Sequence, residues 1–212
     1  MKVSIIPVTS YQQNCSLLIC ETTNKAALVD PGGDVNVLLD AIEKEEATLE
    51  SIILTHGHLD HVGATAELAS MFNIPVEGPH HDDQFLIEAI PSQCQVFGFP
   101  PCDSFVPTRW LKEGDVVEVG EETLEVIHCP GHTPGHIVLH HVSSKLALVG
   151  DVLFKGSIGR TDLEKGDYHT LIDSIQNKLW PLGGNISFIP GHGPMSTFAE
   201  EMEGNPFVKL AL

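Results

Sequence analysis

Four side chains that can bind transition metals lie within six residues of one another. His56, His58, Asp60 and His61 belong to the sequence T-H-G-H-L-D-H, which follows the segment S-I-I-L at 51–54. A neutral imidazole binds a borderline divalent cation through one ring nitrogen, and an ionised carboxylate can bridge two cations. This composition suits zinc, iron or manganese better than magnesium or calcium. The cluster therefore predicts half of a site for two metal ions.

Three more residues of the same kinds follow predicted strands further along the chain. His132 lies in P-G-H-T-P-G-H, Asp151 follows L-A-L-V-G, and His192 lies in P-G-H-G-P after I-S-F-I. Each of them leaves an apolar segment and enters a turn rich in glycine or proline. A sheet holds a ligand at a strand end firmly, and glycine lets the backbone approach a metal closely. We therefore expect these residues to complete the metal site.

In order and spacing, the seven residues resemble the signature of the metallo-β-lactamase superfamily: H-x-H-x-D-H, one later His, one Asp and a final His. The resemblance covers nearly the whole chain. It implies two groups of three ligands joined by a bridging carboxylate: His56, His58 and His132 for one metal ion, Asp60, His61 and His192 for the other, and Asp151 between them. His136 shares the loop of His132 and can orient another ligand from outside the coordination sphere. A structural hydrogen bond within the turn is the alternative role for His136.

The chemistry of such a site is hydrolysis by a hydroxide that bridges the metals. Two cations about 3.5 to 4 Å apart lower the pKa of a bound water from about 15.7 to about 7. The predicted catalytic carboxylates are Asp151, which bridges the metals, and Asp60, which can also orient the hydroxide through a hydrogen bond. His58 favours hydrolysis, because the oxygen-reducing diiron members of the superfamily have glutamate at the matching position.

Within the hydrolases of the superfamily, the two His-rich loops and the segment G-R-T-D at 159–162 are similar to those of small bacterial type II glyoxalases, the hydroxyacylglutathione hydrolases. The resemblance implies hydrolysis of S-lactoylglutathione to D-lactate and glutathione, a step of methylglyoxal detoxification. The implied cofactors are two divalent ions, zinc first, with iron or manganese as alternatives. A thioester suits this site, because a thiolate with a pKa of about 8.5 leaves without strong acid catalysis.

The sequence departs from the larger type II glyoxalases in how glutathione would be held. Those enzymes carry a carboxyl-terminal helical domain with basic residues for glutathione, whereas only twenty residues follow His192 in this sequence. Lys155 and Arg160 are the candidates to bind a substrate carboxylate, and Tyr168 is a further candidate for substrate binding. Arg160 can equally form an internal ion pair with Asp162, and the sequence leaves both roles open.

Two other enzyme classes stay open. Persulfide dioxygenases share the metal motif and a similar G-R-T-D segment but use one iron, which here would be bound by His56, His132 and Asp151. A metallohydrolase of another thioester or ester is the second alternative. The absence of an export signal disfavours a β-lactamase. A structural zinc site is disfavoured because it normally has four ligands and is closed.

The elements that must position these residues repeat in the two halves of the chain. Strands are predicted at 3–8, 16–20, 26–29, 51–54, 115–119, 123–128, 137–142, 145–149 and 186–189. Helices are predicted after Asp34 as a cap, from about 60 to 72, from 82 to 90 and from 167 to 179, with 91–107 as a loop. Both halves run strand, turn with Asp, helix, strand, His loop. Such units would pack as an α/β fold, a four-layer αβ/βα sandwich with both His loops at one edge, which the resemblance also implies.

Length and composition are those of a globular protein. The chain has 212 residues, 42% of them hydrophobic, and we expect residues 1–212 to form one domain. No apolar run approaches the length of about 18 residues that a membrane helix needs, and the lack of a secretion signal favours the cytoplasm. The formal charge of -18, with 11 Lys and Arg, disfavours nucleic acid. The expected partner is a small-molecule glutathione thioester, and the sequence gives no oligomeric state.

Overall fold

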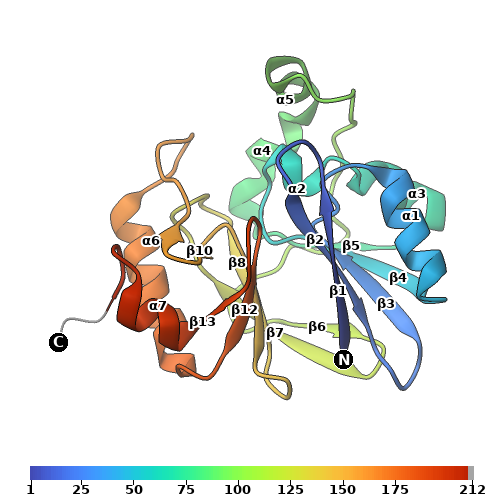
Figure 1. Ribbon diagram of the computed structural model, residues 1–212. Coiled ribbons are helices and arrows are strands. Elements are labelled where there is room, and N and C mark those ends of the chain that lie inside the picture. The colour runs from blue at the N-terminus through green and yellow to red at the C-terminus, as the bar shows by residue number, and fades with distance from the viewer. Residues whose placement is uncertain (210–212) are drawn as a thin grey trace.

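Two β-sheets face each other, and helices cover the outer face of each (Figure 1). The computed structural model describes residues 1–209, so the last three residues of the predicted domain, 210–212, lie outside the described range. Helices α1 and α3 lie on one side of the pair of sheets, and α6 and α7 lie on the other. The predicted α/β class and four-layer αβ/βα arrangement are confirmed.

The first sheet comes from the amino-terminal half and has the order β1-β2-β3-β4-β5. Its strands are β1 (Lys2–Val8), β2 (Gln13–Ile19), β3 (Lys25–Val29), β4 (Thr48–Ile53) and β5 (Val76–Glu77). The helices of this half are α1 (Val35–Lys44), α2 (Leu59–Val62), α3 (Thr65–Phe72), the 3-10 turn η1 (His81–Asp83), α4 (Gln84–Glu88) and α5 (Ile90–Phe97). Strands β3 and β4 are parallel, with α1 as the connection between them.

The second sheet has the order β13-β12-β9-β8-β7-β6. Its strands are β6 (Val116–Val119), β7 (Glu122–His128), β8 (Ile137–His141), β9 (Leu146–Gly150), β12 (Ser187–Pro190) and β13 (Ser196–Thr197). The remaining elements are the hairpin β10 (Leu153–Phe154) and β11 (Ser157–Ile158), α6 (Tyr168–Ser174), the π-helical turn η2 (Ile175–Leu179), the 3-10 turn η3 (Trp180–Leu182) and α7 (Phe198–Gly204). Strands β9 and β12 are parallel, with α6, η2 and η3 between them.

Apolar side chains fill all three spaces between the four layers. Leu18 and Ile53 of the first sheet pack with Leu124 and Leu139 of the second in the central space. A separate cluster lies between the first sheet and its helices, and another lies between the second sheet and its helices. Because every strand with two apolar faces is covered on both sides, the sheets form a rigid frame.

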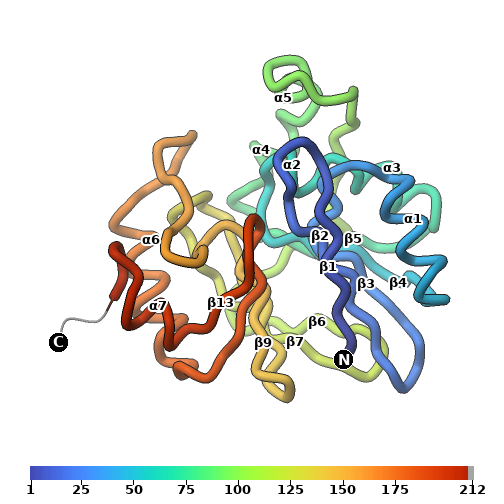
Figure 2. Tube along the Cα trace, viewed as in Figure 1, coloured from blue at the N-terminus to red at the C-terminus, as the bar shows by residue number. Residues whose placement is uncertain are grey.

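The repeat seen in the sequence is a repeat of structure. In each half, a helical connection joins two parallel strands, whose carboxyl ends lie at the same edge of their sheet. Figure 2 shows β3 and β4, the pair of the first half, next to each other. The carboxyl ends of parallel strands lie side by side, so the residues that follow them are brought together. Asp30 and His56 follow one pair, and Asp151 and His192 follow the other.

Three details of the predicted elements were wrong. The predicted loop 91–107 begins with a helix, α5, which tolerates Pro91 because a proline in the first turn needs no backbone N–H donor. The helix predicted from about residue 60 is divided into α2 and α3 around Gly63. Asp34 precedes α1 without capping it, because its carboxylate accepts a hydrogen bond from Thr9 N at 2.7 Å instead. Within residues 1–209, no helix is both long and apolar enough to cross a membrane.

Candidate metal centre

All seven predicted ligands lie in segments that meet at one edge of the two sheets. The loop after β4 carries His56 and His58, and the first turn of α2 carries Asp60 and His61. The ligands from the carboxyl-terminal half follow three different strands: His132 after β7, Asp151 after β9 and His192 after β12. The two halves of the chain therefore contribute to the same site.

The first metal group consists of His56, His58 and His132, which offer ligand atoms within 4.8 Å of one another. Nδ1 of His58 lies 3.1 Å from Nε2 of His56 and 2.9 Å from Nε2 of His132. Burial lowers the pKa of His58 to about 3, which favours the neutral imidazole that a metal requires. Three neutral nitrogens thus surround one point.

The second metal group consists of Asp60, His61 and His192, whose ligand atoms also lie within 4.8 Å of one another. Oδ2 of Asp60 lies 3.2 Å from Nε2 of His192 and 4.0 Å from Nε2 of His61. Burial lowers the pKa of His61, but the carboxylates of Asp151 and Asp60 outweigh burial and raise it. This half of the site therefore favours positive charge.

Asp151 lies between the two metal groups. Its Oδ2 atom is 3.6 Å from Nε2 of His132 in the first group and 3.7 Å from Nε2 of His192 in the second. Its Oδ1 atom is 3.4 Å from Nε2 of His61. The backbone approaches this carboxylate closely, because a Cβ atom on Gly191 would lie 2.1 Å from Oδ1. Only glycine fits there, as the Gly-rich loop predicted.

Two buried atoms at the centre of the site have no hydrogen-bond partner among the described residues. They are Nε2 of His61 and Oδ1 of Asp151. A buried polar atom without a partner is costly, by about 1 to 3 kcal/mol, unless something else satisfies it. A divalent cation would accept a lone pair from each of these two atoms. It would also supply the positive charge that the carboxylates of Asp60 and Asp151 favour at this place. The residues present therefore fit divalent metal ions.

Outward-facing ring nitrogens of two ligands are fixed by the backbone. Nδ1 of His132 donates to the carbonyl of Arg160 at 2.8 Å, and Nδ1 of His192 donates to the carbonyl of Tyr11 at 3.1 Å. A carbonyl only accepts, so the proton stays on Nδ1 and the lone pair of Nε2 faces the metal group. These contacts set both the tautomer and the direction of each ligand.

Asp30 is a functional candidate that the sequence analysis missed. Its carboxylate accepts from Nδ1 of His61 at 2.9 Å and from the hydroxyl of Thr55 at 2.5 Å. The hydroxyl of Thr55 in turn lies 3.1 Å from Nδ1 of His56, so Asp30 reaches one ligand in each group. The repeat contained a signal for it, because Asp30 follows β3 as Asp151 follows β9.

His136, proposed to orient a ligand, lies against the site without entering either group. Its Nε2 atom accepts from the backbone N–H of Asp151 at 3.0 Å. Its ring stacks on that of His56, with centroids 4.6 Å apart. His136 therefore contacts the backbone of the bridging residue and the face of one ligand.

A cavity of about 540 Å³ opens beside both metal groups. Ligands His58, Asp60, His132, Asp151 and His192 form its floor. Its walls are largely apolar: Tyr11, Leu59, Phe97, Phe99, Phe154, Ile158 and Leu163. A cavity of this size that joins metal ligands to an apolar wall is the candidate substrate site.

Of the three residues proposed to bind substrate, Arg160 borders this cavity. Its guanidinium also forms the internal ion pair with Asp162, through two hydrogen bonds of 2.7 and 2.8 Å. Lys155 and Tyr168 are not among the residues that line the cavity, and Nζ of Lys155 lies 3.9 Å from Glu200. Arg160 is thus the one lysine or arginine among the described residues that line it.

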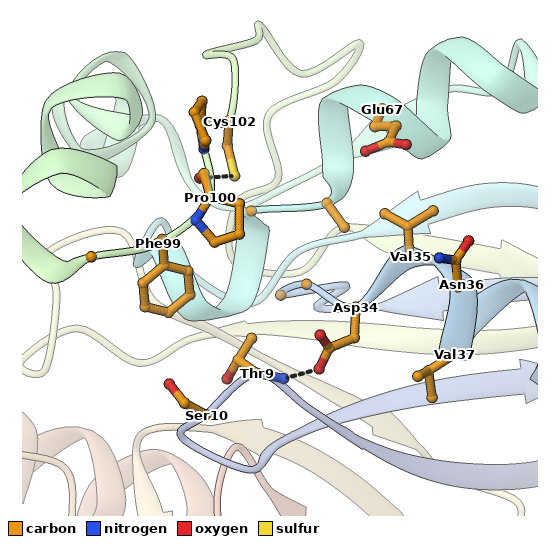
Figure 3. A pocket seen from close by; sticks show the side chains of 16 residues that line it. Thr9, Ser10, Asp34, Val35, Asn36, Val37, Glu67, Phe99, Pro100 and Cys102 are labelled. Carbon is orange, nitrogen blue, oxygen red and sulfur yellow. Dashed lines mark hydrogen bonds between the residues drawn. The ribbon is translucent and has the colours of Figure 1, made fainter.

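A second cavity, of about 650 Å³, lies between the loop before β2 and the start of α1 (Figure 3). Its lining includes Thr9, Asp34, Glu67 and Phe99, and Asp34 accepts from Thr9 N within it. None of the seven predicted ligands lines this cavity, which therefore lacks the groups for the predicted chemistry. Phe99 lines both this cavity and the cavity at the metal groups.

Known proteins share this fold and sequence. Residues 8–192, which include all seven predicted ligands, match the family model of the metallo-beta-lactamase superfamily. The chain is 47% identical over 209 residues to the hydroxyacylglutathione hydrolase GloC of Haemophilus influenzae, and the match covers 98% of each. The BLEG-1 B3 metallo-beta-lactamase superposes with a TM-score of 0.90 and 34% identity, covering 98% of this chain and 99% of that one. The structure of TTHA1623 in a di-iron-bound form superposes with a TM-score of 0.89 and 33% identity, and the match covers 97% of this chain and 100% of that one.

Replacement of Asp30 by Asn should weaken metal binding. The amide keeps the size of the side chain but removes the charge that accepts from His61 and Thr55. Loss of such an outer contact typically weakens metal affinity about 10- to 100-fold. Competition with a chromophoric chelator measures the change, with Asp40→Asn on the exposed side of α1 as the control. An unchanged affinity in Asp30→Asn would show that His61 does not depend on this carboxylate.

Proposed function

This chain belongs to the metallo-beta-lactamase superfamily and is a metal-dependent hydrolase, and we propose that it hydrolyses hydroxyacylglutathione thioesters, S-lactoylglutathione above all. The observation that carries the proposal is the pair of metal groups that share Asp151 at the floor of an apolar cavity. The 47% identity with GloC over almost the full length of both chains supports glutathione as the thiol. The products would be D-lactate and glutathione.

We propose that the first and second metal groups each hold one divalent ion and that Asp151 bridges them. When bound, the two ions supply a hydroxide near neutral pH and polarise the thioester carbonyl. Zinc is the proposed metal, and iron or manganese would suit the same mixture of imidazole and carboxylate. The di-iron form of TTHA1623 supports two iron ions as the alternative.

The chain's own carboxylates would orient the reaction. Asp60 lines the cavity, and its neighbours hold its pKa below the usual range although burial opposes this, so it is ionised at neutral pH. It can therefore accept a hydrogen bond from the attacking oxygen and turn it toward the substrate carbonyl. No protein acid near the leaving group is needed, since a thiolate with a pKa of about 8.5 leaves readily.

The residues that line the cavity are metal-group residues on one part and apolar residues on another. We propose that the acyl group lies over the former and that the thiol half extends along Phe97, Phe99 and Tyr11. Glutathione carries two carboxylates, and Arg160 is placed to meet one of them. Arg160 can do so because its ion pair with Asp162 is exposed and such pairs contribute little to stability. Lys155 and Tyr168, outside the cavity wall, remain proposed contacts for the more distant parts of the substrate.

The metal-loaded protein should hydrolyse S-lactoylglutathione faster than thioesters of other thiols, because the latter lack the carboxylate that Arg160 would meet. The release of free thiol, followed with a thiol reagent for a panel that includes a coenzyme A thioester and a β-lactam, measures this preference. Equal rates on all thioesters would keep the hydrolase and overturn glutathione as the substrate. Oxygen uptake with glutathione persulfide, without thioester hydrolysis, would instead favour a persulfide dioxygenase.

Replacement of Arg160 by Gln should raise KM for S-lactoylglutathione about tenfold and leave kcat nearly unchanged, because the contact would be equally strong in ground and transition states. Asp162→Asn should lower KM or leave it unaltered, since it frees the guanidinium from its partner. Lys25→Gln is the matched control, because it also removes a cation from an exposed ion pair, with Glu50, but lies away from the cavity. Steady-state kinetics measure all three variants. A fall in kcat with constant KM in Arg160→Gln would contradict a binding role.

A further inference from the structure

Asp83, at the end of η1, connects two loops that carry metal ligands. The residue is fully buried. Its Oδ2 atom accepts from the backbone N–H of Gly57 at 2.9 Å and from the hydroxyl of Thr133 at 2.7 Å. Its Oδ1 atom accepts from the backbone N–H of Gly135 at 2.6 Å. One carboxylate therefore holds three donors from two distant segments of the chain.

These donors lie next to the ligands of the first metal group. Gly57 is between His56 and His58 in the loop after β4, and Thr133 directly follows His132 in the loop between β7 and β8. The two loops belong to different halves of the protein and different sheets. The hydrogen bonds of Asp83 are thus a direct connection between the two sources of the first metal group.

The packing around Asp83 leaves little freedom for either loop. A Cβ atom on Gly135 would lie 2.7 Å from Oδ1 of Asp83, and one on Gly57 would lie 3.3 Å from its Cβ. The backbone N–H of His80 also donates to the carbonyl of Gly135 at 3.1 Å, which ties the start of η1 to the same loop. Both loops therefore rest against η1 at a fixed distance.

The charge of Asp83 strengthens this connection. Burial raises the pKa of Asp83 to about 6, so the group is still ionised at neutral pH. Hydrogen bonds to an ionised acceptor are stronger than those between neutral groups. A carboxylate accepts from all three donors, whereas an amide of the same size would present N–H hydrogens to at least one of them.

We propose that Asp83 is a positioning residue that fixes the distance between the pair His56 and His58 and the third ligand, His132, and so sets the affinity of the first metal group. Among the described residues, its side chain makes no hydrogen bond to α2, which carries Asp60 and His61, or to the loop that carries His192. Its effect should therefore be confined to one of the two metals. The inference rests on the proposed metal ligands and is independent of the proposed substrate.

The test is the occupancy of each metal position in Asp83→Asn. Crystals equilibrated at a series of buffered zinc concentrations report the occupancy of each position through anomalous scattering. We expect the first metal group to need at least tenfold more zinc for half-occupancy, in line with the loss of an outer contact, while the second group fills as in the wild type. Asp82→Asn, an exposed neighbour in the same turn, is the matched control and should behave as the wild type.

Two further variants separate positioning from folding. Thr133→Val removes one donor and keeps the carboxylate, and it should weaken the same metal position by a smaller factor than Asp83→Asn. Both changes act on the same hydrogen bond, from the hydroxyl of Thr133 to Asp83. The double variant should therefore lose less zinc affinity than the product of the two single effects. Thr133→Val also keeps the test available if Asp83→Asn does not fold.

The outcomes are distinct. Equal loss of zinc from both positions, or no loss from either, would overturn the proposed role of Asp83. A wild-type protein without zinc at the first metal group would instead overturn the proposed ligands. Only a selective loss at the first group, absent in Asp82→Asn, agrees with the inference.

Discussion

Ligand atoms that all carry lone pairs repel one another unless a cation lies between them, and the rest of this structure serves to hold seven such residues together. The oxygens of Asp151 lie 3.4 to 3.7 Å from ring nitrogens of His61, His132 and His192, and Oδ1 has no hydrogen-bond partner among the residues that the structure describes. No single loop can impose such an arrangement. The polypeptide has to bring rigid supports from two directions to one place.

The two sheets supply that rigidity, and a layer of outward contacts aims the ligands. Each half ends a parallel pair of strands at the shared edge. Carbonyl oxygens then hold Nδ1 of His132 and His192, and the buried carboxylate of Asp30 holds Nδ1 of His61. Asp83 acts on the loops that carry ligands and not on the ligand rings. It accepts hydrogen bonds from two backbone N–H groups and one hydroxyl of those loops. Because these contacts orient the ligand side chains before metal and substrate bind, the entropy cost of positioning them does not add to the barrier of the reaction.

That the seven candidate ligands come together could be predicted from the sequence, because local signals place them: each group follows an apolar strand and lies beside glycine or proline. The four-layer fold could be predicted because the same order of elements occurs twice. Asp83 could not be found in this way. Its three hydrogen-bond donors lie 26, 50 and 52 residues away in the sequence, and no local pattern encodes such contacts. The predicted helix boundaries around Pro91 and Gly63 were wrong for a related reason. Tertiary packing, and not the local sequence, decides whether a marginal segment continues as helix.

Two metal ions are proposed to bind within bridging distance of each other, in groups contributed by both halves of the chain. X-ray absorption on the zinc-loaded protein tests this most directly, because it measures the metal environment without reference to activity. We expect nitrogen and oxygen ligands only, with a metal–metal distance of about 3.5 to 4 Å. A spectrum without metal–metal scattering, from protein saturated with zinc, would contradict a bridged pair of metals.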